Sequence, residues 1–107
     1  DLERTLFLSI NDSFKVKGIE NGAHGHLGKA GRRNPSLAEI EDCYGAANVG
    51  HNHSAGIFRS VFRVGTSTHL QLSYNDGPSA WSQTHLIQHR NGSRQLIHNI
   101  HGFWKLD

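Results

Sequence analysis

The chain has 107 residues, a net charge of +2 and 36% hydrophobic residues, enough for one small domain with a thin core. A charge this small gives no argument, by itself, for a nucleic-acid-binding protein. The single cysteine excludes an internal disulfide, and the sequence has no run of roughly 18 apolar residues that would form a transmembrane helix.

The cysteine and histidine content indicates a cellular compartment and a possible metal-binding role. A lone cysteine favours a reducing compartment, so we expect a cytoplasmic protein without a membrane partner. The chain begins at Asp1 and contains no methionine, and we therefore expect a processed or trimmed piece of a longer protein. Histidine is over-represented, with 9 residues, and imidazole is the commonest metal ligand in proteins.

The N-terminal third predicts two strands and a long loop. We expect strands over residues 5–10 and 14–19, the second because apolar and lysine side chains alternate in it. Residues 20–34 contain four glycines, which exclude the interior of a regular helix or strand. This segment should be a loop.

One helix is well signalled after that loop. It begins either at Asn34, with Pro35 at the first helical position, or two residues later at Ser36, which has Glu39 at capping-box spacing. Apolar side chains then recur at helical spacing, and Gly45 should end the helix.

The rest of the chain reads as β-structure. We expect strands over 46–49, 57–64, 69–74, 84–90 and 94–101. The Asn91-Gly92 pair predicts a tight hairpin between the last two. We expect Trp81, Phe103 and Trp104 to be packing residues. For Trp81, stacking on a substrate is the less favoured alternative.

Two pairs of histidines follow predicted strands. His51 and His53 come directly after the strand 46–49, and His24 and His26 lie in the loop after the strand 14–19. If these strands belong to one sheet, both loops leave the same edge, and loops of this kind commonly carry functional sites. The alternative is two pairs of exposed imidazoles. The preceding strand and the second pair favour a metal site.

The segments around these histidines resemble a known family. Residues 15–28, the helix and residues 49–54 look like the C-terminal half of a calcineurin-like metallophosphoesterase, which closes its site with a His-Gly loop and a later Gly-His-x-His. Residues 64–67, 72–81 and 91–97 resemble the metallophosphoesterases of tailed bacteriophages. The likeness covers roughly residues 12–106.

The resemblance implies an α+β fold, here the C-terminal part of a β-sandwich flanked by helices, mostly β with one clear helix. It implies hydrolysis of a phosphoester, with a nucleic-acid phosphodiester as a candidate substrate, in the cytoplasm of a bacterial host. Two divalent ions are the implied cofactors: we expect Mn²⁺, with Mg, Fe, Zn or Ni as alternatives. His24 and His51 would bind one ion and His53 the other.

Three further residues complete the expected site. His26 is the candidate catalytic residue, placed beside the ions rather than bound to them. Arg32 and Arg33 are candidates for binding the substrate phosphate, because a guanidinium suits that group. A solvated loop is an equally good interpretation of the two arginines.

The implied site is incomplete within this sequence. The family's Asp-x-His, Gly-Asp-x-x-Asp and Gly-Asn-His motifs are missing from the 107 residues, and two-metal hydrolysis needs bridging carboxylates. The nearby acidic residues are Glu20 and three helix residues that fit a solvated face, namely Glu39, Glu41 and Asp42. We therefore expect the N-terminal half of the same domain, or a second chain, to supply the carboxylates, and expect this chain alone to be inactive. The alternatives are a non-catalytic binding or regulatory module and a histidine-rich structural domain.

Overall fold

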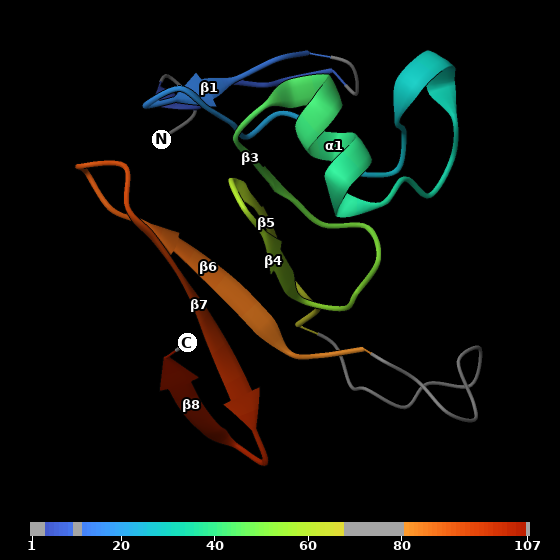
Figure 1. Cartoon of the computed structure of the whole chain (residues 1–107). Coiled ribbons are helices and arrows are strands. Elements are labelled where there is room, and N and C mark those ends of the chain that lie inside the picture. The colour runs from blue at the N-terminus through green and yellow to red at the C-terminus, as the bar shows by residue number, and fades with distance from the viewer. Residues whose placement is uncertain (1–3, 10–11, 68–80, 107) are drawn as a thin grey trace.

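The computed structural model describes residues 4–9, 12–67 and 81–106, which form two β-sheets and one α-helix (Figure 1). The expected α+β class, mostly β, is confirmed. The elements in chain order are β1 (Lys15–Val16), β2 (Ile19–Glu20), the 3₁₀ turn η2 (Lys29–Gly31), α1 (Leu37–Tyr44), β3 (Ala47–Val49), β4 (Gly56–Phe58), β5 (Val61–Arg63), β6 (Thr84–Gln88), β7 (Arg94–Ile100) and β8 (Phe103–Leu106). No helix in these ranges has the length and apolarity that crossing a membrane requires.

The first sheet has five strands in the order β1-β2-β3-β5-β4. The central pairs β2·β3 and β3·β5 are parallel, and the outer pairs are antiparallel. The chain leaves β2, passes through the long loop and α1, and returns as β3. The ends of β2 and β3 therefore lie at the same edge of the sheet, as expected from the sequence.

Helix α1 uses the second of the two predicted starts. The hydroxyl of Ser36 accepts a hydrogen bond from the backbone N–H of Glu39 at 3.2 Å, which satisfies a donor that the helix itself leaves unpaired. The start at Asn34 is therefore wrong. The predicted end is confirmed, since Gly45 takes a φ of 71° and its N–H bonds to the Glu41 carbonyl.

The helix packs its apolar face on the five-stranded sheet. Ile40 is 1% exposed and forms a buried cluster with Ala47, Val49 and Val61. This small core lies directly beneath the loops that follow β2 and β3. Its packing therefore fixes the place where the two histidine-bearing loops begin.

Two predicted strands are in fact hairpins. The segment 14–19 turns at Lys17 and Gly18, whose φ values of 54° and 75° are those of a tight two-residue turn. The segment 57–64 also turns back on itself, at Arg59 and Ser60, where Arg59 alone takes a positive φ, of 50°. A single strand and a hairpin both satisfy the alternation of side chains, which is why the sequence pattern does not reveal these turns.

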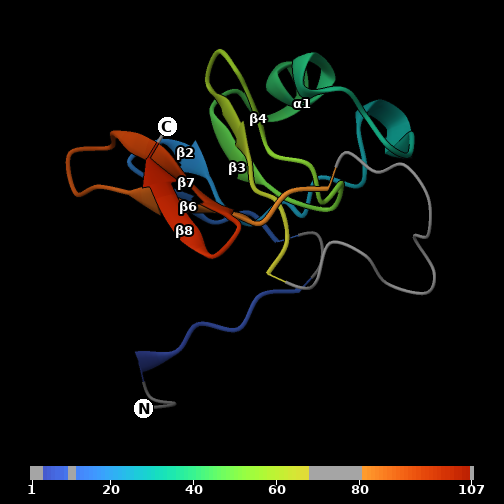
Figure 2. The ribbon, with the colours of Figure 1, turned by 90° about the horizontal axis from the view of Figure 1, so that it is seen from below.

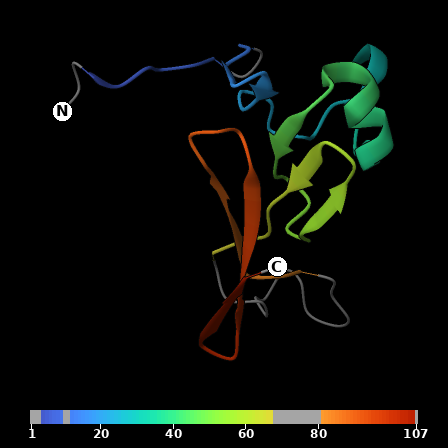
Figure 3. The same ribbon diagram turned by 60° about the vertical axis from the view of Figure 1, so that its left-hand side comes forward.

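The remaining strand predictions have mixed outcomes. Residues 5–9 form no strand and are exposed. The predicted strand 69–74 lies outside the described residues. The hairpin at Asn91-Gly92 is confirmed, because β6 and β7 pair antiparallel on either side of it. Phe103 and Trp104 are 79% and 57% exposed, so the prediction that they pack in the core is wrong. They lie on β8, the outer strand of a sheet that extends past the rest of the fold (Figure 3).

The three-stranded sheet β6-β7-β8 lies on the side of the first sheet opposite α1 (Figure 2). Arg94 on β7 joins the two sheets by donating to the Ala47 and Ser60 carbonyls and to the Asn48 side chain. The Asn48 amide in turn donates to Gln88 on β6 at 2.8 Å. Polar contacts therefore help to hold this junction, together with Leu96, which is 2% exposed and lies on the same face of β7 as Arg94.

Candidate metal centre

The two histidine-bearing loops are bound to each other at the sheet edge. The backbone N–H of Gly50 donates to the His24 carbonyl at 2.8 Å. Gly25 makes this approach possible, because a Cβ there would lie 3.0 Å from the Val49 Cβ and 3.1 Å from the Gly50 oxygen, and its φ is 105°. A side chain at Gly25 would therefore push the loops apart.

Three of the four loop histidines come together where these loops meet. The ring centroids of His24, His26 and His51 are 5.1–5.9 Å apart. The closest approach joins His51 Nδ1 to His24 Nε2, at 3.2 Å. Two nitrogens that bind one Zn²⁺ at about 2.0–2.1 Å, with an angle of about 90–110° between them, lie about 2.9–3.4 Å apart. The observed separation falls within that range.

The surroundings of His24 lower the pKa of its imidazole. Burial is the largest influence that lowers the pKa of the His24 imidazole, and the charges of His51, His26 and His53 add to it. A neutral imidazole has a lone pair to donate, whereas an imidazolium does not. The shift thus favours the form of His24 that a metal ligand needs.

Two buried imidazole nitrogens in the described structure have no hydrogen-bond partner. These are the Nδ1 atoms of His26 and His53. Buried polar atoms are usually satisfied, so each such atom calls for a water, an ion or another partner. Beside His24 and His26 lies a cavity of about 90 Å³, also lined by Asp12 and Glu20, with room for such a group.

His53 lies apart from the other three rings. Its imidazole packs edge-on against the Trp81 ring, with centroids 4.2 Å apart, and its carbonyl accepts from the Ser82 N–H at 2.8 Å. Trp81 is therefore a packing residue here, as expected, but its neighbour is a candidate ligand. No sequence pattern indicates this contact, because it joins residues far apart in the chain.

The loops hold their histidines in an uncommon backbone conformation. His51 and His53 have φ values of 72° and 62°, and Asn34 has 54°. Residues other than glycine rarely adopt positive φ, and such residues cluster at functional sites, each at a cost of about 1–3 kcal/mol. Three strained residues around one cluster are consistent with a site.

Asn34 is the site residue that sequence reasoning missed. The sequence indicates it only as a candidate helix cap, yet its side-chain oxygen lies 3.0 Å from His51 Nε2. Its backbone N–H bonds to the His26 carbonyl at 3.1 Å. The only available signal is its position at the end of the glycine-rich loop.

The acidic residues near the cluster are already engaged. Glu20 is 3% exposed and accepts hydrogen bonds from the Ser13 hydroxyl and from the backbone N–H groups of Phe14 and Gly22. It therefore ties the loop to β1 and β2 instead of pointing at the histidines.

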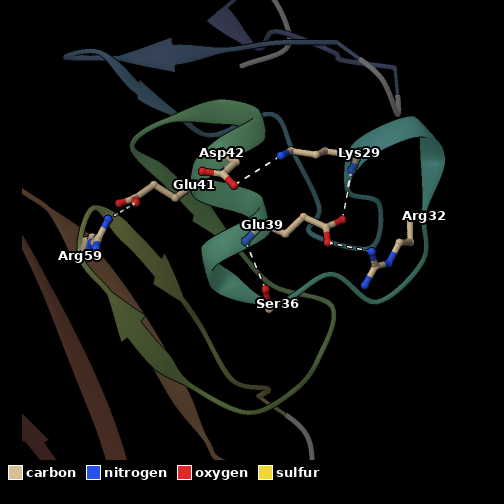
Figure 4. A network of polar contacts seen from close by, with 7 residues as sticks. All are labelled: Lys29, Arg32, Ser36, Glu39, Glu41, Asp42 and Arg59. Atoms are coloured by element: carbon tan, nitrogen blue, oxygen red, sulfur yellow. Dashed lines mark hydrogen bonds and ion pairs between the residues drawn. The ribbon is translucent and has the colours of Figure 1, made fainter.

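The three helix carboxylates form a separate network around α1 (Figure 4). Glu39 accepts from the backbone N–H of Lys29 and lies 3.6 Å from the Arg32 guanidinium. Asp42 pairs with the Lys29 ammonium, and Glu41 binds Ser60 and Arg59.

Across residues 4–9, 12–67 and 81–106, no group of three or more His, Cys, Asp or Glu side chains is arranged to hold a metal ion.

The two candidate phosphate-binding arginines differ in their surroundings. The Arg32 side chain is 75% exposed and its charge is partly compensated by Glu39. Arg33 is exposed, and its backbone pairs with Leu27 across the loop. The two arginines thus differ in that the Arg32 charge is partly compensated by Glu39.

Comparison with known proteins gives one informative likeness. Over 93 residues, or 86% of its length, the chain is 44% identical to "Protein A1" of Escherichia phage T5. The matched region is 16% of that protein, so the chain spans about one sixth of the relative's length. No protein family matches the sequence, and no solved structure matches it. The chain is therefore similar to part of a much longer phage protein.

Proposed function

We propose that this chain contributes the histidine ligands of a metal-dependent phosphoester hydrolase. The observation that carries the proposal is the 3.2 Å separation of His24 Nε2 and His51 Nδ1, which fits two ligands of one ion. His24 and His51 would hold that ion, and His53 a second one, as the likeness to calcineurin-like metallophosphoesterases implies. The unpartnered His53 Nδ1 is a further support.

The protein's own residues would orient the substrate and move its protons. Divalent ions, with Mn²⁺ expected, supply Lewis acidity and lower the pKa of a bound water. The His26 ring lies 5.4 Å from the His24 ring, close enough for its imidazole to exchange a proton with a phosphoester oxygen held at the cluster. Arg33 would contribute charge toward the phosphate.

The carboxylate ligands would come from outside these 107 residues. Glu20, Glu39, Glu41 and Asp42 are all engaged in other contacts. Asp12, which lines the cavity beside His24 and His26, accepts from the Ser9 N–H. A bridging carboxylate is what holds two ions together. The N-terminal half of the same domain, or a second chain, is the proposed source. The long relative, of which this chain matches one sixth, is an example of a protein with room for such a half.

The proposed substrate is a phosphodiester in nucleic acid, within the cytoplasm of a bacterial host. The likeness to a phage protein supports the bacterial host, and the resemblance to the metallophosphoesterases of tailed bacteriophages implies the phosphodiester. A groove of about 740 Å³ runs between the two sheets and is lined by His24, Gly50, Asn48, Thr84 and His85. Its volume lies within the usual range of ligand sites, and His24 in its lining connects the groove to the cluster.

Hydrolysis of bis(4-nitrophenyl) phosphate tests the proposal. In the complete protein, with its carboxylate-bearing part present, we expect Mn²⁺-dependent release of nitrophenol and its loss in the His51→Ala variant. The same rate in that variant would refute the assignment of His51 as a ligand. The 107-residue chain alone should show no turnover.

A second candidate is a non-catalytic module that holds at most one ion. The carboxylates of Glu20, Glu39 and Glu41 accept hydrogen bonds from other parts of the fold, and this favours the second candidate. It predicts binding of one ion by the histidines and no hydrolysis even in the complete protein. The assay above therefore separates the two.

A further inference from the structure

Asn34 occupies a fixed position beside the cluster. The loop that contains it closes on itself, because the Asn34 N–H binds the His26 carbonyl at 3.1 Å and the Gly28 N–H binds the Arg32 carbonyl at 2.7 Å. The backbone of Asn34 is in the left-handed region, at a φ of 54°, which asparagine tolerates better than most residues. Its side chain is thereby directed at His51.

The contact between Asn34 and His51 determines where the imidazole proton lies. The Asn34 Oδ1 atom lies 3.0 Å from His51 Nε2, and an amide oxygen can only accept a hydrogen bond. His51 Nε2 must therefore carry the proton. In a neutral ring this leaves the lone pair on Nδ1, the atom that faces His24 Nε2 at 3.2 Å.

We propose that Asn34 is a positioning residue, which fixes the tautomer and the ring orientation of His51 so that Nδ1 is its metal-donating atom. The part that concerns the metal rests on the function proposed above; the tautomer itself does not. A hydrogen bond from the second ring nitrogen is the usual means of orienting a metal-binding histidine, and its loss typically weakens metal affinity about 10–100-fold.

Three substitutions separate the side-chain oxygen from the backbone conformation. Asn34→Gly removes the oxygen and relieves any strain at positive φ. Asn34→Ala removes the oxygen and keeps the strain. Asn34→Asp retains an oxygen acceptor and should rescue the contact. If Asn34 acted only through its backbone, the glycine variant would behave like wild type and the alanine variant would not.

The direct test is long-range ¹H–¹⁵N NMR of the metal-free 107-residue chain, well above the ordinary imidazole pKa of about 6.5. We expect His51 to carry its proton on Nε2 in wild type and in Asn34→Asp, and to show both tautomers in Asn34→Ala and Asn34→Gly. A proton on Nδ1 in wild type, as a reversed amide would give, overturns the proposal. So does an unchanged tautomer in both variants that lack the oxygen.

Titration with Zn²⁺, followed on the same spectra, tests the metal-directed part. We expect the His51 Nδ1 signal to shift on binding, and the affinity to fall about 10–100-fold in Asn34→Ala and Asn34→Gly but not in Asn34→Asp. Equal affinity in all four proteins overturns this part. A fixed tautomer in a wild-type chain that binds no Zn²⁺ would count against the proposed function while supporting the role of Asn34 in orienting His51.

Discussion

The guanidinium of Arg94 lies 4.1 Å from the centroid of the Phe62 ring, between the two sheets of the molecule. From there it also donates to the Ala47 and Ser60 carbonyls and to the Asn48 side chain. A planar cation with several donors thus makes the polar contacts of this junction, beside the buried Leu96. The position of the three-stranded sheet depends on it.

Substitution of Arg94 should destabilise the fold strongly. Arg94→Ala removes three part-buried hydrogen bonds from a charged donor, at about 1–3 kcal/mol, and loses a cation–π contact worth about 0.5–2 kcal/mol. Urea unfolding followed by circular dichroism measures the loss. Arg94→Lys should recover little, because an ammonium cannot make the same three bonds and stack. Arg90→Ala, at an exposed position, is the control and should change the free energy of unfolding by less than about 0.5 kcal/mol. Equal losses of stability in Arg94→Ala and Arg90→Ala would contradict this role of Arg94 at the junction.

Glu20 should make stability depend on acid pH. Burial raises the pKa of its carboxyl, but the hydrogen bonds from Ser13, Phe14 and Gly22, with the charge of Lys15, more than offset burial and lower the pKa overall. A group whose pKa is lower in the folded state stabilises the fold above its unfolded pKa, about 4.3. That stabilisation disappears as the pH falls through the folded pKa.

The Glu20→Gln variant tests this dependence. Its urea midpoint should be lower than that of wild type near neutral pH, and the difference should shrink as the pH is lowered below about 4.3. The half-buried Glu41, whose pKa is also lowered, chiefly by its bond from the Ser60 hydroxyl, is present in both proteins and cancels in the comparison. A difference that stays constant down to low pH would show that Glu20 acts by packing rather than by charge.

Gly25→Ala should damage the site more than the fold. Its new methyl group would meet Val49 and Gly50 at 3.0–3.1 Å, which forces apart the loops that carry His24 and His51. Gly18→Ala is the matched control, since Gly18 also has a positive φ but has no atom within 4 Å of the point where a Cβ would lie. Both variants should lose about 1–2 kcal/mol of stability.

Metal affinity distinguishes the two glycine variants. Zn²⁺ titration should show a loss of at least about tenfold in Gly25→Ala and wild-type affinity in Gly18→Ala. Similar affinities in the two would mean that the approach of the loops does not matter for ion binding.

Local signals predicted the elements that depend on local chemistry. Ser36, Glu39 and Gly45 set the bounds of α1 through hydrogen bonds within a few residues, and Asn91-Gly92 set the β6–β7 hairpin. The turns at Lys17-Gly18 and Arg59 were missed because neither carries a strong turn signature, and their flanking residues alternate as a single strand would. Tertiary pairing, rather than propensity, decides such cases.

The order of the strands was enough to predict that the two histidine-bearing loops lie at one edge of the sheet, but not the side-chain contacts around them. Parallel pairing of β2 and β3 brings His24 and His51 to one edge, and the histidine spacing after each strand was enough to expect this. The contacts of Asn34 with His51 and of Trp81 with His53 depend on how distant loops fold back. No pattern in the sequence encodes them locally.

Isothermal titration of the 107-residue chain with Zn²⁺ tests the central claim, that His24 and His51 are ligands of one ion. We expect wild type to bind, His24→Ala and His51→Ala to lose binding, and His89→Ala to bind like wild type, because His89 contacts Gln95 at the β6–β7 turn, away from the cluster. A wild-type chain that binds no Zn²⁺, or equal binding by His51→Ala and His89→Ala, would contradict that claim.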